Sequence, residues 1–202
     1  MTKQEREYLN KYKDVPTDFL ERYELLLNDT NFKRAKTTVF EEIDRINKIK
    51  WKEISYIIYL EPKPTPRPRL GKSGVFYVSG ALNNKKLFQK YVINREDITL
   101  ITTPTKFYCT SYFPIPKSMH PIEKLVAELG FIYPTSKPDW DNVAKAYCDM
   151  VQGILLYDDS LIIEGVSKKR YSSKPRIEIT LKYMEDYDSN FNRSKILRKV
   201  GN

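Results

Sequence analysis

The chain has 202 residues, and its 35 Lys+Arg against 26 Asp+Glu give a formal net charge of +9 and a pI near 9.3. This length predicts one domain of ordinary size with room for an extension. No apolar run approaches the ~20 residues that span a bilayer, and the first residues lack a signal-peptide core, so we expect a cytoplasmic protein without a membrane partner. Two cysteines and one histidine disfavour a disulfide framework, a cysteine-based zinc site and any nuclease site that needs two histidines.

The charge is distributed unevenly along the chain. The net charge is +1 over residues 1–50, +7 over 51–138, −5 over 139–164 and +6 over 165–202. A basic protein attracts polyanions, chiefly nucleic acid, whereas an acidic patch within it would repel the same partner. The conflict disappears if the acidic patch binds divalent cations that face phosphate.

Residues 1–50 are polar, with apolar side chains at helical spacing in two stretches. The spacing is i, i+4, i+7, and its members are Phe19, Tyr23 and Leu26, then Val39, Ile43 and Ile46. The pattern predicts a helical N-terminal extension of two or three amphipathic helices, to which the sequence assigns no role.

From Trp51 the pattern changes to short strands and helices. We expect a strand over 54–60, a stiff proline-rich loop over 62–72, a short strand over 75–78 and a basic helix over 82–94. One long strand or two short ones should follow within 98–113, and then a helix over 121–130, with His120 as a surface or capping residue.

The C-terminal part predicts a helix over 141–152 and strands over 162–171 and 176–182. We expect these two strands to form an antiparallel pair joined by residues 172–175. The predicted fold class is therefore α/β (α+β), a compact mixed β-sheet with helices packed on it over residues 51–184, followed by a basic tail over 185–202.

The segment from Asp139 to Asp149 carries the strongest chemical signal. Asp141, Lys145 and Asp149 lie at i, i+4, i+8, so they share one helix face. Taken singly, an aspartate at a helix start is a cap, and the three residues could form a solvated stripe of salt bridges. However, Asp139 lies beside Asp141, and a second pair, Asp158-Asp159, follows one short apolar turn later.

Several carboxylates without His or Cys are typical of a site for Mg²⁺, or Mn²⁺. Such a site can activate water and stabilise the leaving oxygen of a phosphodiester. Lys145 would then neutralise the scissile phosphate or orient water. From spacing alone, a plain acidic surface is as good an interpretation. Trp140, inside the motif, is expected to pack in the core, with stacking on a base as the less favoured alternative.

The run Lys-Pro-Asp139-x-Asp141-Asn142-x-x-Lys145-x-x-x-Asp149, followed by Asp158-Asp159 and a strand, resembles the RusA family of Holliday-junction resolvases. The earlier Pro66-Arg67-Pro68-Arg69 resembles that family's proline/arginine loop, and the resemblance covers roughly residues 52–183. It implies a homodimeric, Mg²⁺-dependent endonuclease, bacterial or phage-encoded, that cuts four-way DNA junctions in recombination and repair. Matched to the family motif, the metal-binding catalytic aspartates are Asp139, Asp141 and Asp159, the catalytic lysine is Lys145, and Asp158 is a neighbouring acidic ligand.

Clusters of basic residues fit a DNA-binding function. These residues lie on the predicted stiff loop, a helix and a strand, from which they could contact backbone phosphates. We expect such contacts from Arg67, Arg69, Lys72, Lys85, Lys86, Lys168, Lys169 and Arg170. Two alternatives stay open. One is a non-catalytic basic nucleic-acid-binding module. The other is a PD-(D/E)xK-type nuclease, which Pro138-Asp139 mimics, although Glu164 and Glu178 lack the lysine that this motif places two residues later.

Overall fold

The computed structural model describes residues 1–29, 36–64, 69–71, 74–76, 80–93 and 100–187. Arg67, Lys72 and the predicted basic tail beyond residue 187 lie outside the described residues. Two compact units divide the chain between Lys50 and Trp51. Within the described ranges, no helix combines the length and apolar character that crossing a membrane requires.

The first unit is helical, as predicted, and contains α1 (Lys3–Asn10), α2 (Thr17–Leu27) and α4 (Lys36–Asn47). A capping box formed by Thr2 and Glu5 starts α1, because each side chain accepts from the other residue's backbone N–H. The Tyr8 hydroxyl donates to the Phe40 carbonyl at 3.1 Å, so α1 is tied to α4.

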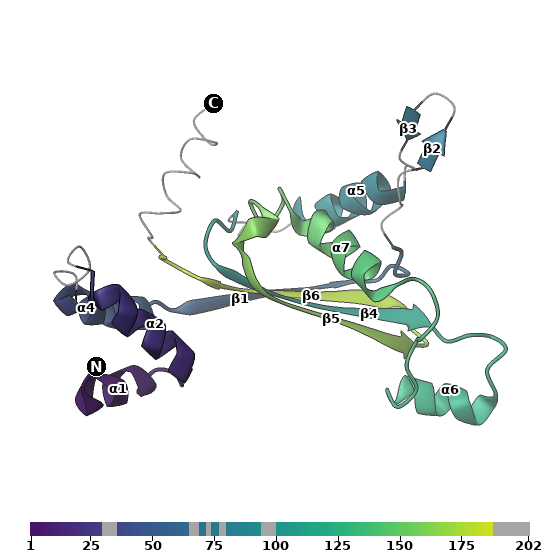
Figure 1. The fold of residues 1–202 in the computed structure, drawn as a ribbon. Helices are drawn as coiled ribbons and strands as arrows, with labels where there is room; N and C mark the ends of the chain where they lie inside the picture. Colours follow the sequence, from purple (N-terminus) through teal and green to yellow (C-terminus); the bar gives the residue numbers. More distant parts are fainter. Residues whose placement is uncertain (30–35, 65–68, 72–73, 77–79, 94–99, 188–202) are drawn as a thin grey trace. The chain divides into compact units, whose positions relative to one another are not determined.

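The second unit is built on a four-stranded mixed sheet with the order β1-β6-β4-β5 (Figure 1). Strands β4 and β5 are parallel, whereas β6 runs antiparallel to both β4 and β1. The strands are β1 (Trp51–Ile58), β4 (Thr105–Pro114), β5 (Ile162–Ser172) and β6 (Arg176–Met184). A mixed sheet with helices packed on it confirms the predicted fold class.

The predicted antiparallel pair of β5 and β6 is wrong. Strand β4 lies between them, with Cys109 opposite Ser167 of β5 on one side and opposite Ile179 of β6 on the other. The two helices between β4 and β5 return the chain to the end at which β4 started, so β5 can only run parallel to β4. The short turn after β5 therefore crosses over β4 to reach its other edge.

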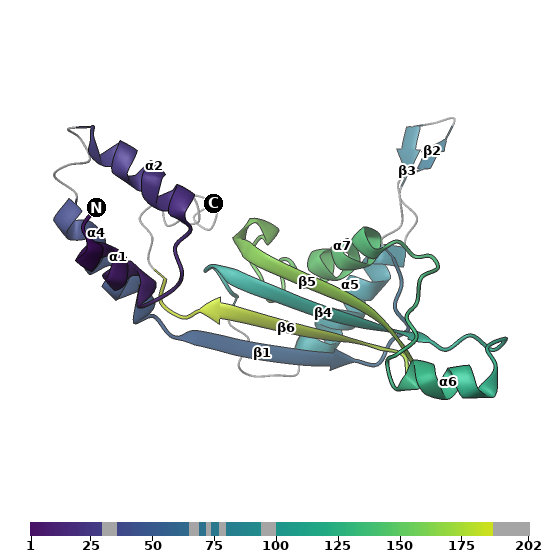
Figure 2. The same cartoon turned by 60° about the horizontal axis from the view of Figure 1, so that its bottom comes forward.

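The helices of this unit are α5 (Gly80–Ile93), α6 (Pro121–Glu128) and α7 (Trp140–Val151), with a 3₁₀ turn η1 (Asp159–Leu161) before β5. Figures 1 and 2 show α5 and α7 over one face of the sheet and α6 at one end of it. A short hairpin pairs β2 (Arg69–Gly71) with β3 (Gly74–Phe76). The expected capping role of His120 is confirmed, because its Nδ1 accepts from the Ile122 N–H at the start of α6.

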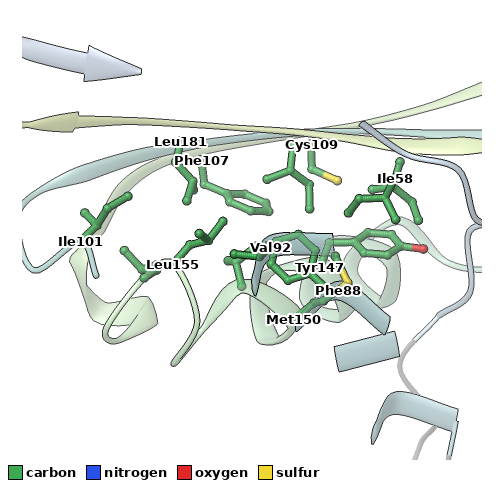
Figure 3. Close-up of a cluster of buried hydrophobic side chains, with 14 of the residues drawn as sticks. Ile58, Phe88, Val92, Ile101, Phe107, Cys109, Tyr147, Met150, Leu155 and Leu181 are labelled. Atoms are coloured by element: carbon green, nitrogen blue, oxygen red, sulfur yellow. The ribbon is translucent and has the colours of Figure 1, made fainter. Parts of the chain in front are cut away.

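Alternation along β4 places one row of side chains in the core. The residues between the inward-facing ones are half-buried. The inward-facing residues are Thr105, Phe107, Cys109, Ser111 and Phe113. Figure 3 shows Phe107 and Cys109 facing the side chains of α5 and α7. The sheet and the two helices thus form one hydrophobic core that holds α7 in place.

Tyr147 links this core to the proline-rich segment after β1. Its ring is 1% exposed in the middle of α7, and its hydroxyl accepts from the Lys63 N–H at 2.8 Å and donates to the Lys63 carbonyl at 3.3 Å. Helix α7 therefore fixes the start of the loop that leads to the predicted DNA-binding arginines.

Candidate functional site

The start of α7 is anchored to β5 by one lysine. Pro138 disfavours helix in the residue before it, and Asp139 is the N-cap of α7 with extended backbone angles. The Lys169 ammonium donates to the carbonyls of Ser136 at 2.9 Å and Pro138 at 2.8 Å. These hydrogen bonds hold the segment that carries the two aspartates of the motif against the sheet.

A cavity of about 310 Å³ lies between α7 and the β4–β5 side of the sheet. Its apolar wall comes from the strands and includes Phe107, Ile162 and Val166. Its polar wall comes from α7 and η1, and consists of Lys145, Asp149 and Asp159, with Trp140 and Cys148 beside them. Lys145 and Asp149 of α7 therefore converge with Asp159 of η1 on one concave surface.

The charges in this cavity are coupled. The Lys145 Nζ lies 3.2 Å from Asp149 Oδ1, and this hydrogen bond, with the field of Asp149 and Asp159, raises the pKa of Lys145. Burial, followed by the fields of Asp159 and Asp149, raises the pKa of the Cys148 thiol to about 11. Lys145 is thus a persistent cation, and Cys148 stays a neutral thiol at physiological pH.

Asp139 and Asp141 are exposed and do not line the cavity. Asp141 nevertheless lies on the helix face of Lys145 and Cys148, one turn nearer the start of α7. Asp158 accepts from the Ser160 N–H at 3.0 Å and so caps η1. In the part of the chain that the structure describes, no three Asp, Glu, His or Cys side chains gather closely enough to hold a metal ion.

The basic residues predicted to bind DNA take different positions. Lys86 and Lys168 are exposed, on α5 and β5. The Lys85 ammonium lies close to Gly153, whose positive φ of 75° ends α7. Lys169 holds the 136–138 loop, and the Arg170 guanidinium lies 4.7 Å from the centre of the Tyr133 ring. Arg69 belongs to β2.

Two residues of the cavity were missed or misplaced by the sequence reasoning. Asp149 was not predicted as a site residue, although its spacing from Asp141 and Lys145 indicated a shared helix face. Trp140 was expected in the core, and this is wrong, because its side chain is 56% exposed. Its indole Nε1 instead donates at 2.9 Å to the carbonyl of Ser167 on β5, a residue that lines the same cavity.

Comparison with known proteins identifies the family to which the chain belongs. The family model described as Endodeoxyribonuclease RusA matches residues 60–182, which include β4, α7, η1, β5 and nearly all of β6. The chain is also similar to an uncharacterized protein, YqaN, of Bacillus subtilis (strain 168). The two are 32% identical over 136 residues, which cover 64% of this chain and 95% of the relative. Because the matched residues form more than half of the chain and contain the whole cavity, this chain belongs to the RusA family of endodeoxyribonucleases.

Proposed function

We propose that the chain is a divalent-metal-dependent endonuclease that resolves four-way DNA junctions in recombination or repair. The observation that carries the proposal is the convergence of Lys145, Asp149 and Asp159 on one cavity within the region that matches the family. The family supplies the endodeoxyribonuclease activity, and the cavity supplies a place where a phosphodiester can meet both a fixed cation and carboxylates.

The donors available at the site are all oxygens, which suits Mg²⁺ or Mn²⁺. We assign the ion to Asp159 together with Asp139, Asp141 and Asp158. The last three are sequence neighbours of the cavity-lining residues Trp140 and Asp159. A divalent ion bound there would lower the pKa of water and neutralise charge on the phosphate. The Lys169 anchor supports this assignment, since it fixes the backbone on which Asp139 and Asp141 are carried.

Lys145 is assigned to the scissile phosphate. Without DNA its ammonium pairs with Asp149, and the neighbouring carboxylates raise its pKa, so it stays protonated at neutral pH. An anionic phosphate oxygen offers it a stronger, charge-assisted hydrogen bond at the same position. We therefore expect Lys145 to exchange Asp149 for the phosphate when DNA binds.

Two exposed lysines outside the cavity are assigned to the DNA arms. Lys86 and Lys168 are solvent-accessible cations, of the kind that contacts backbone phosphates without reading sequence. A homodimer is part of the proposal as well, because a two-fold enzyme presents two equivalent sites to the two equivalent strands of a junction.

The test uses the purified protein and a labelled four-way junction in EDTA, Mg²⁺ or Mn²⁺. We expect binding in all three buffers and paired nicking only with metal. Asp159→Asn and Lys145→Ala should abolish nicking but retain binding. Glu164→Gln is the matched control, because this carboxylate lies on β5 yet faces Lys106 and Tyr108 instead of the cavity.

Binding without nicking in every metal would favour the second candidate, a non-catalytic basic DNA-binding module. Loss of binding in Asp159→Asn would show that this carboxylate maintains the fold. Sedimentation of the protein–junction complex measures whether two chains bind one junction, and a single bound chain would contradict the dimer.

A further inference from the structure

Trp140 is the most unusual hydrophobic residue at the site. It is the first residue of α7, and it lines the same cavity as Lys145 and Asp159. Large aromatic side chains contribute most of their stabilisation when they are buried, yet more than half of this side chain faces solvent. An aromatic ring exposed beside a phosphate-binding lysine is a surface on which a nucleobase can stack.

The indole is also held in place before any ligand arrives. Its Nε1 donates to the Ser167 carbonyl at 2.9 Å, so β5 fixes the orientation of a ring that α7 carries. A pre-organised ring loses little conformational freedom on binding, which favours its use in recognition. The hydrogen bond uses the polar edge of the indole and leaves the π-faces for contact.

We infer that Trp140 is a positioning residue that stacks on an unpaired base next to the scissile phosphate, and this inference rests on the proposed nuclease function. In an intact duplex both faces of each base are covered by neighbouring base pairs. At a branch point a base can be unstacked at lower cost, so a fixed indole beside the cleavage site favours branched DNA over duplex. Lys145 would hold the phosphate while Trp140 holds the adjoining base.

The rival explanation is structural. The Nε1–Ser167 hydrogen bond could serve only to clamp the start of α7 to β5, and the exposed ring would then have no partner. The two roles need different parts of the side chain. Stacking requires an aromatic face, which phenylalanine retains, whereas the clamp requires the indole N–H, which phenylalanine lacks.

Fluorescence provides a readout that does not depend on cleavage. The chain has two tryptophans, so Trp51→Phe leaves Trp140 as the single reporter. In EDTA we expect a four-way junction to quench this variant and a duplex of the same length to leave it nearly unchanged. The reciprocal variant Trp140→Phe retains only Trp51 and should respond little to either DNA. Equal quenching by junction and duplex, or none by either, would overturn the inference.

Cleavage then separates stacking from clamping. We expect Trp140→Ala to lose about tenfold or more in junction cleavage, with Trp140→Phe within about threefold of the parent, since base–aromatic stacking contributes on this scale. Phe131→Ala is the matched control, because Phe131 is 74% exposed and does not line the cavity. If Trp140→Phe fell as far as Trp140→Ala, the hydrogen bond would be the function of the residue. If the parent failed to cut while junction still quenched Trp140, the nuclease proposal would fail and the stacking would stand.

Discussion

Lys169 offers the sharpest test of how this site is held together, because sequence and structure give it different roles. Next to Lys168 in a basic run, it was predicted to contact DNA. In the structure its ammonium donates to the carbonyls of Ser136 and Pro138 and lies 5.7 Å from the centre of the Phe113 ring. We therefore expect Lys169→Met to disturb the loop before α7 and leave DNA affinity largely intact.

The magnitude follows from these contacts. Hydrogen bonds from a charged donor each contribute about 1.5–3 kcal/mol when buried, and since Lys169 is only half-buried we expect about 2 kcal/mol from the two together. For a domain of this size that loss corresponds to a fall in Tm of about 4–8 °C. Loosening the segment that carries Asp139 and Asp141 should also reduce cleavage by about a hundredfold, the effect of a displacement near 1 Å at a reacting centre.

The assay compares Lys169→Met with Lys168→Met, its exposed neighbour on the opposite face of β5. Thermal unfolding, junction binding across a salt series and single-turnover cleavage are measured for both. Lys168→Met should leave Tm nearly unchanged and lower the log–log salt slope by about 0.9, the value for one phosphate contact. The reasoning is refuted if Lys169→Met instead keeps its stability and lowers the salt slope.

Substitutions at two further positions test the elements around the cavity. Gly165 faces the cavity beside Phe107, and an added Cβ would meet nothing nearer than a methyl group at 4.0 Å, so Gly165→Ala should be tolerated. Gly165→Leu should fill the cavity and reduce cleavage at least tenfold at unchanged junction affinity. Full activity of this variant in a gel assay would show that substrate does not enter the cavity. Tyr147→Phe removes both hydrogen bonds to Lys63, so we expect it to lower the free energy of unfolding by about 1 kcal/mol in urea titrations and to weaken junction binding. Unchanged binding in this variant would mean that the proline-rich loop is positioned without Tyr147.

The local pattern of residues was enough to predict most of the elements. Pro138 before α7 and Gly153 after it define the helix on which Lys145 lies, and the predicted range of 141–152 agrees with Trp140–Val151. The alternation in β4 likewise predicted a strand, although it begins at Thr105, several residues later than expected. These features depend on neighbours within a few positions, so they are visible in the sequence.

The spacing of charges drew attention to a segment that lines a cavity in the structure. The acidic run from Asp139 to Asp159 within a basic chain indicated a site facing phosphate, and Lys145 and Asp159 line the cavity that the structure shows there. Whether Asp139 and Asp141 share an ion with Asp159 stays a prediction, because the cavity itself reaches neither of them.

Pairing and side-chain direction were decided by the tertiary structure alone. Strand β4 separates β5 from β6, Lys169 reaches the 136–138 loop, and Trp140 is hydrogen-bonded to Ser167 instead of lying in the core. Each of these depends on a contact between residues more than 25 positions apart. Local preference fixes the periodicity of a helix or strand, but the partner of each face is chosen by the packing of the whole sheet, which no short stretch of the sequence contains.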